Sequence, residues 1–415
     1  EVQVPASAFE VTGSRSHGHV QAVAEAMKKL GFDRLLGPEK GRLKQVVKTL
    51  VAARILEPAS KLSTASALDH STLAETFDVQ GVTEDGLYEA MDWLLERQPQ
   101  IEKRLAKRHL EPCGLVLYDL TSSYVEGAKC PLATRGYSRD GKPQKLQVNF
   151  GILTDEMGRP IAVDVYEGRT ADSATVRDQL VKVRSTFGLE QVVFVGDRGM
   201  LAQTVIEEMK EQDQGFEWIT ALKSGSLRKL RAEGSLQMDL FDERNIFEFK
   251  SDLYPGERLV ACRNPALAVR RARKRIEMIE ATMDALRGIQ KSVEEGRLVD
   301  SGKIGVRVGR VINKYKMAKH IDLDIGEGCL GFAVNEDSVE EESSLDGLYV
   351  VRTSVPAEAI ERDDVVRSYK RLTKVERDFR SMKASGLEVR PIFHRTEPRV
   401  RAHIFLCMLA QYVQW

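Results

Sequence analysis

The sequence contains few of the residues that hold metals or form disulfide frameworks. Its 415 residues include five cysteines and seven histidines. No Cys-x-x-Cys pair occurs, which argues against a zinc ribbon and a disulfide framework, so we expect reduced, packed thiols. These cysteines are scattered along the chain: Cys113, Cys130, Cys262, Cys329 and Cys407. His17 and His19 lie close together in "SRSHGHV" without a further histidine or cysteine nearby, so we expect a loop there and no metal site.

Long apolar runs are also absent. No run approaches the roughly 20 residues that span a bilayer, and the start has no signal-peptide pattern. We therefore expect a cytoplasmic protein without a membrane partner. The length predicts two or three domains. Because the sequence begins with Glu1 instead of Met, an N-terminal piece can be missing.

The chain has no net charge, since 62 Lys and Arg balance 62 Asp and Glu. The charges are nevertheless segregated. Residues 264–275 and 304–319 carry bases and no acid, and residues 367–401 carry eleven bases against four acids. Residues 334–346 carry six acids and no base, and we expect an acidic loop there. Local basic surfaces attract phosphate backbones, whereas solvated helix faces are the alternative explanation, and composition leaves both open.

The hydrophobic period divides the chain into regions. From residue 19 to about 107 it is helical, with segments at 20–32, 43–56 and 86–109. Strand patterns follow at 114–120, 146–154 and 159–166. A helix at 173–187, a strand at 191–197, a helix at 201–211 and a strand at 216–222 complete the series. This order predicts an α/β fold with a mixed sheet flanked by helices, preceded by an all-helical domain.

A less regular segment interrupts this pattern after residue 223. It contains a strand at 245–250, a long basic helix at 270–296 and the acidic stretch, and we interpret it as an inserted α+β segment. A strand at 347–354, a helix at 361–385 that ends at Gly386, and a last helix at 400–415 follow. We therefore expect four parts: residues 1–107, 108–225, 226–345 and 346–415.

Three carboxylates stand out against these elements. Asp119 lies in a strand with apolar residues on both faces, so we expect it to be half buried. Asp197 follows the apolar strand "VVFV". Glu376 shares a helix face with Tyr369 and Lys383, each seven residues away, and its apolar neighbours Leu372 and Phe379 predict that it lies near the buried side.

Two interpretations account for these acids. In the first, Asp119 and Asp197 cap strand ends or turns, and Glu376 pairs with Arg380 on its own helix. In the second, the three converge. Carboxylates in one cleft repel by about 4 kcal/mol per pair at roughly 4 Å, so they need divalent cations, and oxygen-only ligands suit Mg²⁺ or Mn²⁺. Two such ions support in-line phosphoryl transfer. The ordered set of two aspartates and a later glutamate favours the second interpretation.

The sequence resembles the DDE transposases of bacterial insertion sequences, in the IS4 group and most closely its IS1634-like branch. The resemblance rests on "YDLTSSYVEG", "RGYSRDGKPQKLQVNFGIL", "VVFVGDRGM", "VERDFRSMK" and the C-terminal "LEVRPIFHRTEPRVRAHIFLCMLAQYVQW". It extends into the helical region through "VAARILEPASKLSTA". It implies an RNase H-like catalytic fold with an insertion before the glutamate helix. It also implies cleavage at transposon ends, followed by attack of the freed 3′-hydroxyl on target DNA.

The resemblance carries specific roles to this chain. Asp119, Asp197 and Glu376 correspond to the catalytic, metal-binding acids, with two Mg²⁺ ions that Mn²⁺ can replace. Lys383 corresponds to a phosphate contact, and Tyr369 is a further DNA contact. The signature's arginine position holds Leu372, and its neighbours Arg371 and Lys374 are the candidates to replace it.

Other DNA contacts follow from the residues. Arg135, Arg139 and Lys142 lie in the basic, loop-like "RGYSRDGK" and are candidate phosphate contacts, although a solvated hairpin loop explains each singly as well. Arg198 either orients Asp197 or faces solvent.

The expected partners are double-stranded transposon ends and target DNA, held by a homodimer. The N-terminal helices are the candidate for end recognition. The resemblance also implies a bacterial protein that is nucleoid-associated when it is bound to DNA. Two alternatives remain: a DNA-binding protein derived from a transposase that no longer catalyses, and a stand-alone nuclease of the same fold that cleaves without joining.

Overall fold

The computed structural model describes residues 13–415 apart from 212–214, 238–240 and 242–244. The chain divides into two compact units. Unit 1 comprises the described residues up to 220 together with 353–355 and 364–415, and unit 2 comprises those of 221–352 and 356–363. In the described residues, no helix has both the length and the apolar composition needed to cross a membrane.

Unit 1 begins with short helices, in agreement with the helical period of this region. They are α1 (Gly18–Lys29), α2 (Phe32–Leu36), α3 (Arg42–Leu56), α4 (Lys61–Ala67), α5 (Leu73–Thr76), α6 (Glu84–Glu96) and α7 (Gln98–His109). The helix predicted at 86–109 is wrong in one respect, because it breaks at Arg97 and restarts with Pro99 in its first turn. The loop predicted around His17 and His19 is also partly wrong, since His19 lies in the first turn of α1.

The sheet of unit 1 runs in the order β3-β2-β1-β4-β5. Its strands are β1 (Leu115–Tyr124), β2 (Gln147–Asp155), β3 (Pro160–Glu167), β4 (Val192–Val195) and β5 (Phe216–Ala221). The first three pair antiparallel, whereas β4 is parallel to both β1 and β5. The expected α/β fold, an RNase H-like mixed sheet flanked by helices, is therefore confirmed.

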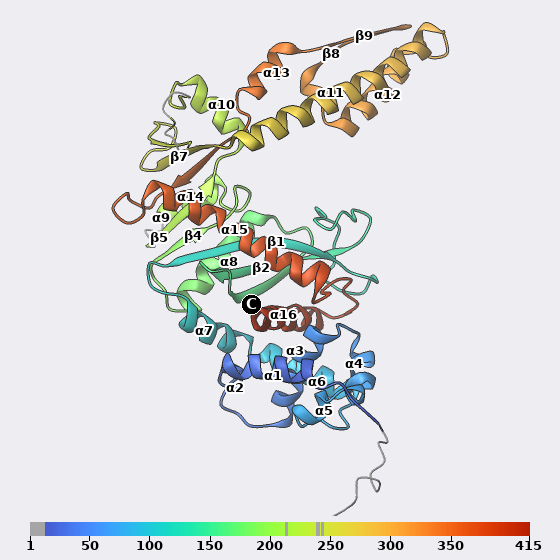
Figure 1. Ribbon diagram of the computed structural model, residues 1–415. Coiled ribbons are helices and arrows are strands. Elements are labelled where there is room, and N and C mark those ends of the chain that lie inside the picture. The colour runs from blue at the N-terminus through green and yellow to red at the C-terminus, as the bar shows by residue number, and fades with distance from the viewer. Residues whose placement is uncertain (1–12, 212–214, 238–240, 242–244) are drawn as a thin grey trace, which may run out of the picture. The chain divides into compact units, whose positions relative to one another are not determined.

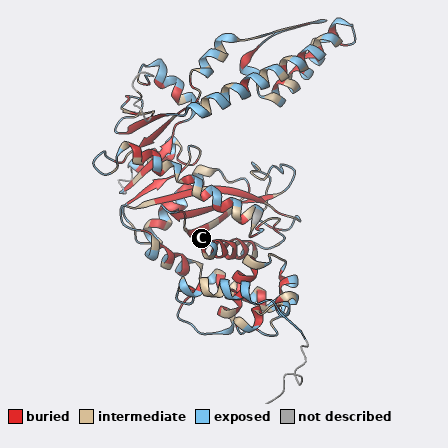
Figure 2. Ribbon diagram, in the orientation of Figure 1, coloured by how far each residue is buried: buried red, intermediate tan, exposed pale blue. Residues whose placement is uncertain are grey.

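Helices α8 (Asp172–Val181), α9 (Gln203–Glu211) and α16 (Glu397–Gln414) accompany this sheet. α16 is apolar on all sides and contacts β3, α3 and α6, so it joins the sheet to the N-terminal helices. Figure 2 shows α16 as an almost continuously buried helix. The helix predicted at 361–385 is instead α14 (Arg362–Lys370) and α15 (Leu372–Arg380), followed by a wider π turn at Ser381–Ser385.

Unit 2 contains strands in the order β10-β7-β6, formed by β6 (Ile246–Phe249), β7 (Arg258–Arg263) and β10 (Leu348–Thr353), with α10 (Ser224–Ala232). A long arm extends from them (Figure 1). In it, α11 (Pro265–Glu294) packs on α12 (Ser301–Tyr315) and on the hairpin of β8 (Ile321–Gly326) and β9 (Cys329–Val334).

The prediction of an acidic loop at 334–346 is wrong, because residues Glu336–Ser343 form helix α13. The side chain of Asn335 caps this helix by accepting a hydrogen bond from the Ser338 N–H. Asn264 caps α11 in the same way, which is why the long basic helix begins at Pro265, earlier than its hydrophobic period indicates.

Candidate active site

The register of two parallel strands brings the aspartates of unit 1 together. Leu117 on β1 pairs with Val195 on β4, and Asp119 and Asp197 each follow two residues later. Neighbouring strands lie about 4.8 Å apart, so the two carboxylates emerge at adjacent points of the same sheet edge. Both residues are half buried, as the sequence predicted for Asp119. One oxygen of Asp119 accepts the Leu120 N–H at 2.8 Å.

A tight turn fixes the Asp197 carboxylate. Its Oδ1 atom accepts the N–H groups of Gly199 and Met200, both at 2.8 Å. A Cβ atom on residue 199 would lie 3.2 Å from this oxygen, so glycine lets the carboxylate fold back over the turn. Asp197 thus caps a turn with one oxygen, as the first interpretation expects. Its Oδ2 atom has no hydrogen-bond partner among the described residues, which leaves a ligand oxygen available.

Glu376 stands on α15, which packs against β1. Val375 is buried and the Phe379 ring meets the Phe150 ring edge-on at 5.6 Å, so these residues anchor the helix. Glu376 itself is exposed, and the prediction that it lies near the buried side is wrong. Among the described residues it forms no ion pair, so its expected pairing with Arg380 does not occur.

The three acids lie within one another's electrostatic field. Burial, and after it the charges of Asp197 and Glu376, raise the pKa of Asp119 to about 7, although the Leu120 N–H and the Arg139 guanidinium act to lower it. The pKa of Tyr369 is raised to about 12, mainly by burial and then by the same three carboxylates. The Tyr369 hydroxyl is therefore part of this acidic site.

The donor set has the chemistry that a hard divalent cation requires, since carboxylate oxygens of all three acids remain available as ligands. The three carboxylates do not, however, converge on one point as the ligands of a bound ion do. In the described part of the chain, no group of three or more His, Cys, Asp or Glu side chains is close enough to hold a metal ion. The fit therefore lies in the type of donor atom and in the electrostatic field that the three acids share.

Lys383, the expected phosphate contact, is held by partners that the sequence analysis missed. Its Nζ donates to Thr121 Oγ1 at 2.5 Å and lies 3.0 Å from Asp140 Oδ1. The Asp140 side chain is 1% exposed, also pairs with Arg390, and accepts the Tyr124 N–H at 3.1 Å. Asp140 is the one acid within the basic "RGYSRDGK", a signal that could have indicated a buried ion pair.

The candidate bases of that loop have separate environments. The Arg139 guanidinium donates to both oxygens of Asp172, at 2.6 and 2.7 Å, and the backbone N–H of Arg139 donates to Ser122 Oγ on β1. The Lys142 ammonium lies 4.0 Å from the centre of the Tyr124 ring. Arg135, like Arg198 beside Asp197, is exposed and forms no ion pair within the described ranges.

Leu372 occupies the family's arginine position as an apolar core residue, 8% exposed. The two bases expected to replace it both turn toward Glu156, on the turn between β2 and β3. Arg371 pairs with the Glu156 carboxylate, and Lys374 Nζ donates to its backbone carbonyl at 3.2 Å. Neither base faces the three acids by these contacts.

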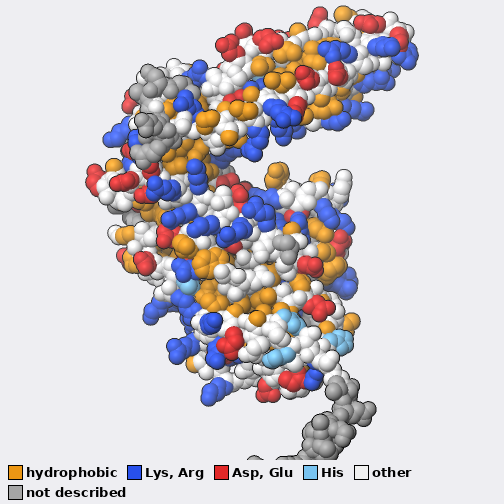
Figure 3. Space-filling model, in the orientation of Figure 1, with side chains coloured by type: hydrophobic (Ala, Val, Ile, Leu, Met, Phe, Trp, Pro, Cys, Tyr) orange, Lys and Arg blue, Asp and Glu red, His pale blue; other side chains and the backbone are white. Residues whose placement is uncertain are grey.

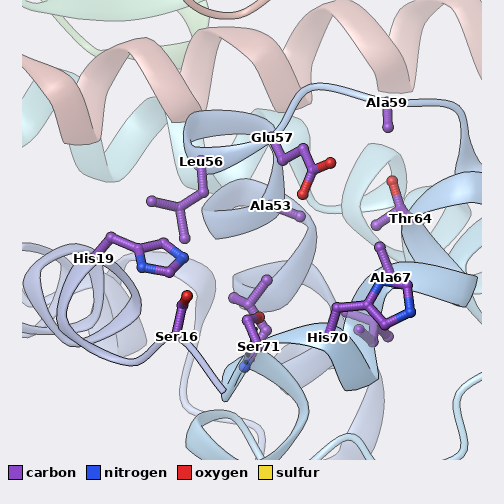
Figure 4. Close-up of a pocket in the computed structure, with 12 residues that line it drawn as sticks. Ser16, His19, Ala53, Leu56, Glu57, Ala59, Thr64, Ala67, His70 and Ser71 are labelled. Atoms are coloured by element: carbon purple, nitrogen blue, oxygen red, sulfur yellow. Dashed lines mark hydrogen bonds between the residues drawn. The ribbon is translucent and has the colours of Figure 1, made fainter. Parts of the chain in front are cut away.

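A cavity of about 160 Å³ lies among the N-terminal helices and contains none of the predicted site residues. Figure 4 shows His19 of α1, Glu57 after α3 and His70 around the same space, together with Ser16, Thr64 and Ser71. These polar groups are mostly exposed. We assign the cavity no part in the chemistry.

The chain was compared with solved structures and with curated proteins. Among solved structures, the chain is similar to piggyBac transposase in a synaptic complex with hairpin DNA, at 9% identity and a TM-score of 0.43, covering 99% of this chain and 69% of that one. It is also similar to Mos1 transposase in a paired-end complex with the left transposon end, at 14% identity and a TM-score of 0.18, covering 47% of this chain and 62% of that one. No curated protein gives a significant match.

The model of a protein family described as "Transposase DDE domain" matches residues 114–412. The match covers most of the chain and includes all three acids, Asp119, Asp197 and Glu376. The chain therefore belongs to the transposase DDE domain family.

Proposed function

We propose that this chain is an insertion-sequence transposase of the IS4 group, IS1634-like branch, that cleaves DNA at transposon ends and joins the freed 3′-hydroxyl to target DNA. The observation that carries the proposal is the β1–β4 register, which sets Asp119 beside Asp197. The negative charges of Asp197 and Glu376 both act on Asp119 and raise its pKa. Each step exchanges one P–O bond for another. First, water displaces the 3′ oxygen at the transposon end; then that 3′-hydroxyl displaces an oxygen at a target phosphate.

The residues of the site have distinct proposed roles. Asp119, Asp197 and Glu376 would hold two Mg²⁺ or Mn²⁺ ions, which supply a lowered pKa for the attacking oxygen and charge stabilisation for the leaving one. Lys383 contacts a phosphate near the scissile bond, and Tyr369 is a further DNA contact. Arg139, fixed by Asp172, orients its loop toward the same strand.

Further phosphate contacts come from Arg135, Lys142 and Arg198, whose charges remain exposed or half exposed. Arg371 and Lys374 contribute only if DNA displaces them from Glu156.

The parts of the chain divide the work in this proposal. Residues 1–107 recognise transposon ends, 108–225 and 346–415 form the catalytic core, and 226–345 are the insertion. The active complex is a homodimer on paired ends. Sedimentation of the protein with end DNA tests this, because a complex with one chain per DNA end pair would contradict it.

The decisive experiment compares Asp197→Asn with the wild-type chain on labelled DNA that carries the element's ends, in Mg²⁺, Mn²⁺ or EDTA. We expect metal-dependent cleavage and joining that the substitution abolishes while DNA binding persists. Asp92→Asn is the matched control, because Asp92 is a half-buried aspartate whose carboxylate pairs with Arg399 at 2.9 Å.

The outcomes separate the possible functions. Unchanged activity in Asp197→Asn would show that the carboxylate only caps its turn. Cleavage without joining by the wild-type chain would indicate a nuclease, and binding without cleavage would indicate a DNA-binding protein that no longer catalyses.

A further inference from the structure

Helix α12 in unit 2 has a fixed orientation. Asp300 caps its start, accepting the Lys303 N–H at 2.7 Å. Its buried side consists of Ile304, Val308 and Ile312, which recur every four residues. They share one apolar core with residues of α11, β8 and β9: Leu286, Ile289, Val293, Ile321 and Leu330. Because this face is locked into a core, the opposite side of α12 is held at the surface.

That exposed side carries a row of positive charge, which we call the basic stripe: Lys303, Arg307, Arg310 and Lys314. The spacings of four, three and four residues place all four side chains within a narrow sector of the helix. α12 contains no acidic residue. Figure 3 shows Lys and Arg side chains gathered along one edge of the arm that α11 and α12 form.

The stripe residues lack the acidic partners that several other cations of the same unit have. Arg273 pairs with Glu277, Arg287 with Asp284, and Arg297 with Glu295. No ion pair to a stripe residue occurs within the described residues. The Lys314 Nζ lies 4.9 Å from the centre of the Tyr315 ring. Four like charges along one helix face repel one another, so the folded unit gains nothing from this arrangement by itself.

The dimensions of the stripe match a polyphosphate. From Lys303 to Lys314 the helix advances about 16 Å at roughly 1.5 Å per residue. The same length of duplex DNA carries about ten phosphates, one per roughly 1.7 Å, and about half of them face one side. Four cations thus meet a similar number of phosphates. Lys and Arg are common partners of phosphate oxygens, and a row of them along one helix follows the charge of the backbone, so backbone contact is the simplest match.

We propose that the basic stripe of α12 binds the phosphate backbone of duplex DNA without sequence preference, and so gives the arm a DNA-holding role apart from the catalytic acids. This inference rests on the proposed function for the choice of DNA as the polyanion. Its electrostatic part is counterion release: log affinity falls as log salt rises, and each phosphate neutralised adds about 0.9 to the steepness of this fall, which we call the slope.

The test measures that slope for the full chain on a random-sequence duplex that lacks transposon ends. The stripe variant combines Lys303→Gln, Arg307→Gln, Arg310→Gln and Lys314→Gln. The control variant removes four charges that already have acidic partners, through Arg177→Gln, Arg273→Gln, Arg287→Gln and Arg297→Gln. A third variant exchanges Lys for Arg and Arg for Lys within the stripe and so keeps its charge.

We expect the slope to fall by about 3 to 4 in the stripe variant, and the affinity near 0.1 M salt to fall by up to about 10³-fold. The control and charge-keeping variants should retain the wild-type slope. An unchanged slope in the stripe variant, or an equal fall in the control, overturns the proposal. So does a larger loss on an RNA duplex of the same sequence, which would make RNA the ligand.

The outcomes also distinguish this inference from the proposed function. A stripe variant that keeps its slope, in a wild-type background that cleaves and joins transposon ends, overturns the stripe alone. A wild-type chain that neither cleaves nor joins ends, yet loses its slope on stripe substitution, overturns the proposed function alone.

Discussion

Lys61, the first residue of α4, is a buried cation that no acid compensates. Lys61 is only 4% exposed, and within the described ranges it forms no ion pair. Desolvation, together with the nearby Arg54 charge, lowers the pKa of Lys61 to about 7, while Cys407 acts in the opposite direction. His394 and His403 also lie near it, but burial lowers the pKa of both, so they remain neutral between pH 6 and 9.

This geometry predicts that Lys61→Met stabilises the N-terminal helices in a pH-dependent way. The folded state binds the Lys61 proton more weakly than the unfolded chain, so its burial is costly below pH 7 and costs nothing above pH 10.5. A pKa of about 7 in place of 10.5, at about 1.36 kcal/mol per pH unit, corresponds to a cost of about 5 kcal/mol at pH 6. At pH 9 about 2 kcal/mol remains.

The measurement is amide hydrogen exchange in α3 and α6 at pH 6 and pH 9, since a chain with two units need not unfold in one step. The advantage of Lys61→Met over wild type should shrink by about 3 kcal/mol between these pH values. The packing of the methionine is independent of pH, so this difference isolates the ammonium. Lys29→Met, at an exposed lysine of α1, should show no such change. An equal advantage at both pH values would refute the reasoning.

Two further substitutions test the packing around the site and in the arm. Asp140→Asn should lower the free energy of unfolding of unit 1 by about 3 to 5 kcal/mol, because it leaves Lys383 and Arg390 without their buried carboxylate, and a loss under 1 kcal/mol in urea unfolding would contradict this. Gly305→Ala should stabilise α12 by about 0.5 to 1 kcal/mol, because a Cβ there meets no atom within 4 Å. Slower amide exchange in α12 would support this. Faster exchange would show that another part of the protein packs against Gly305.

The sequence by itself determined those strands whose apolar pattern lies within one short segment of the chain. Apolar runs of strand length predicted β1, β2 and β3, and the apolar run "VVFV" predicted β4, each within a few residues of the structure. The half-buried position of Asp119 followed from apolar residues on both faces of β1. These predictions succeed because side-chain period and burial are local properties of a strand.

Only the tertiary structure decided features that depend on distant partners. Helix α12 has three glycines and several β-branched residues, which are weak helix formers, so it becomes a helix through its core with α11. Glu376 is exposed because Leu372, Val375 and Phe379 form the buried side of α15.

Dependence on distant partners also explains why the sequence alone did not predict the contacts within the candidate site. The β1–β4 register pairs residues nearly 80 positions apart, and Lys383 meets an acid more than 240 positions away, contacts that no sequence period encodes. Local sequence therefore indicated which side chains are candidates for the chemistry, and long-range packing determined which of them meet.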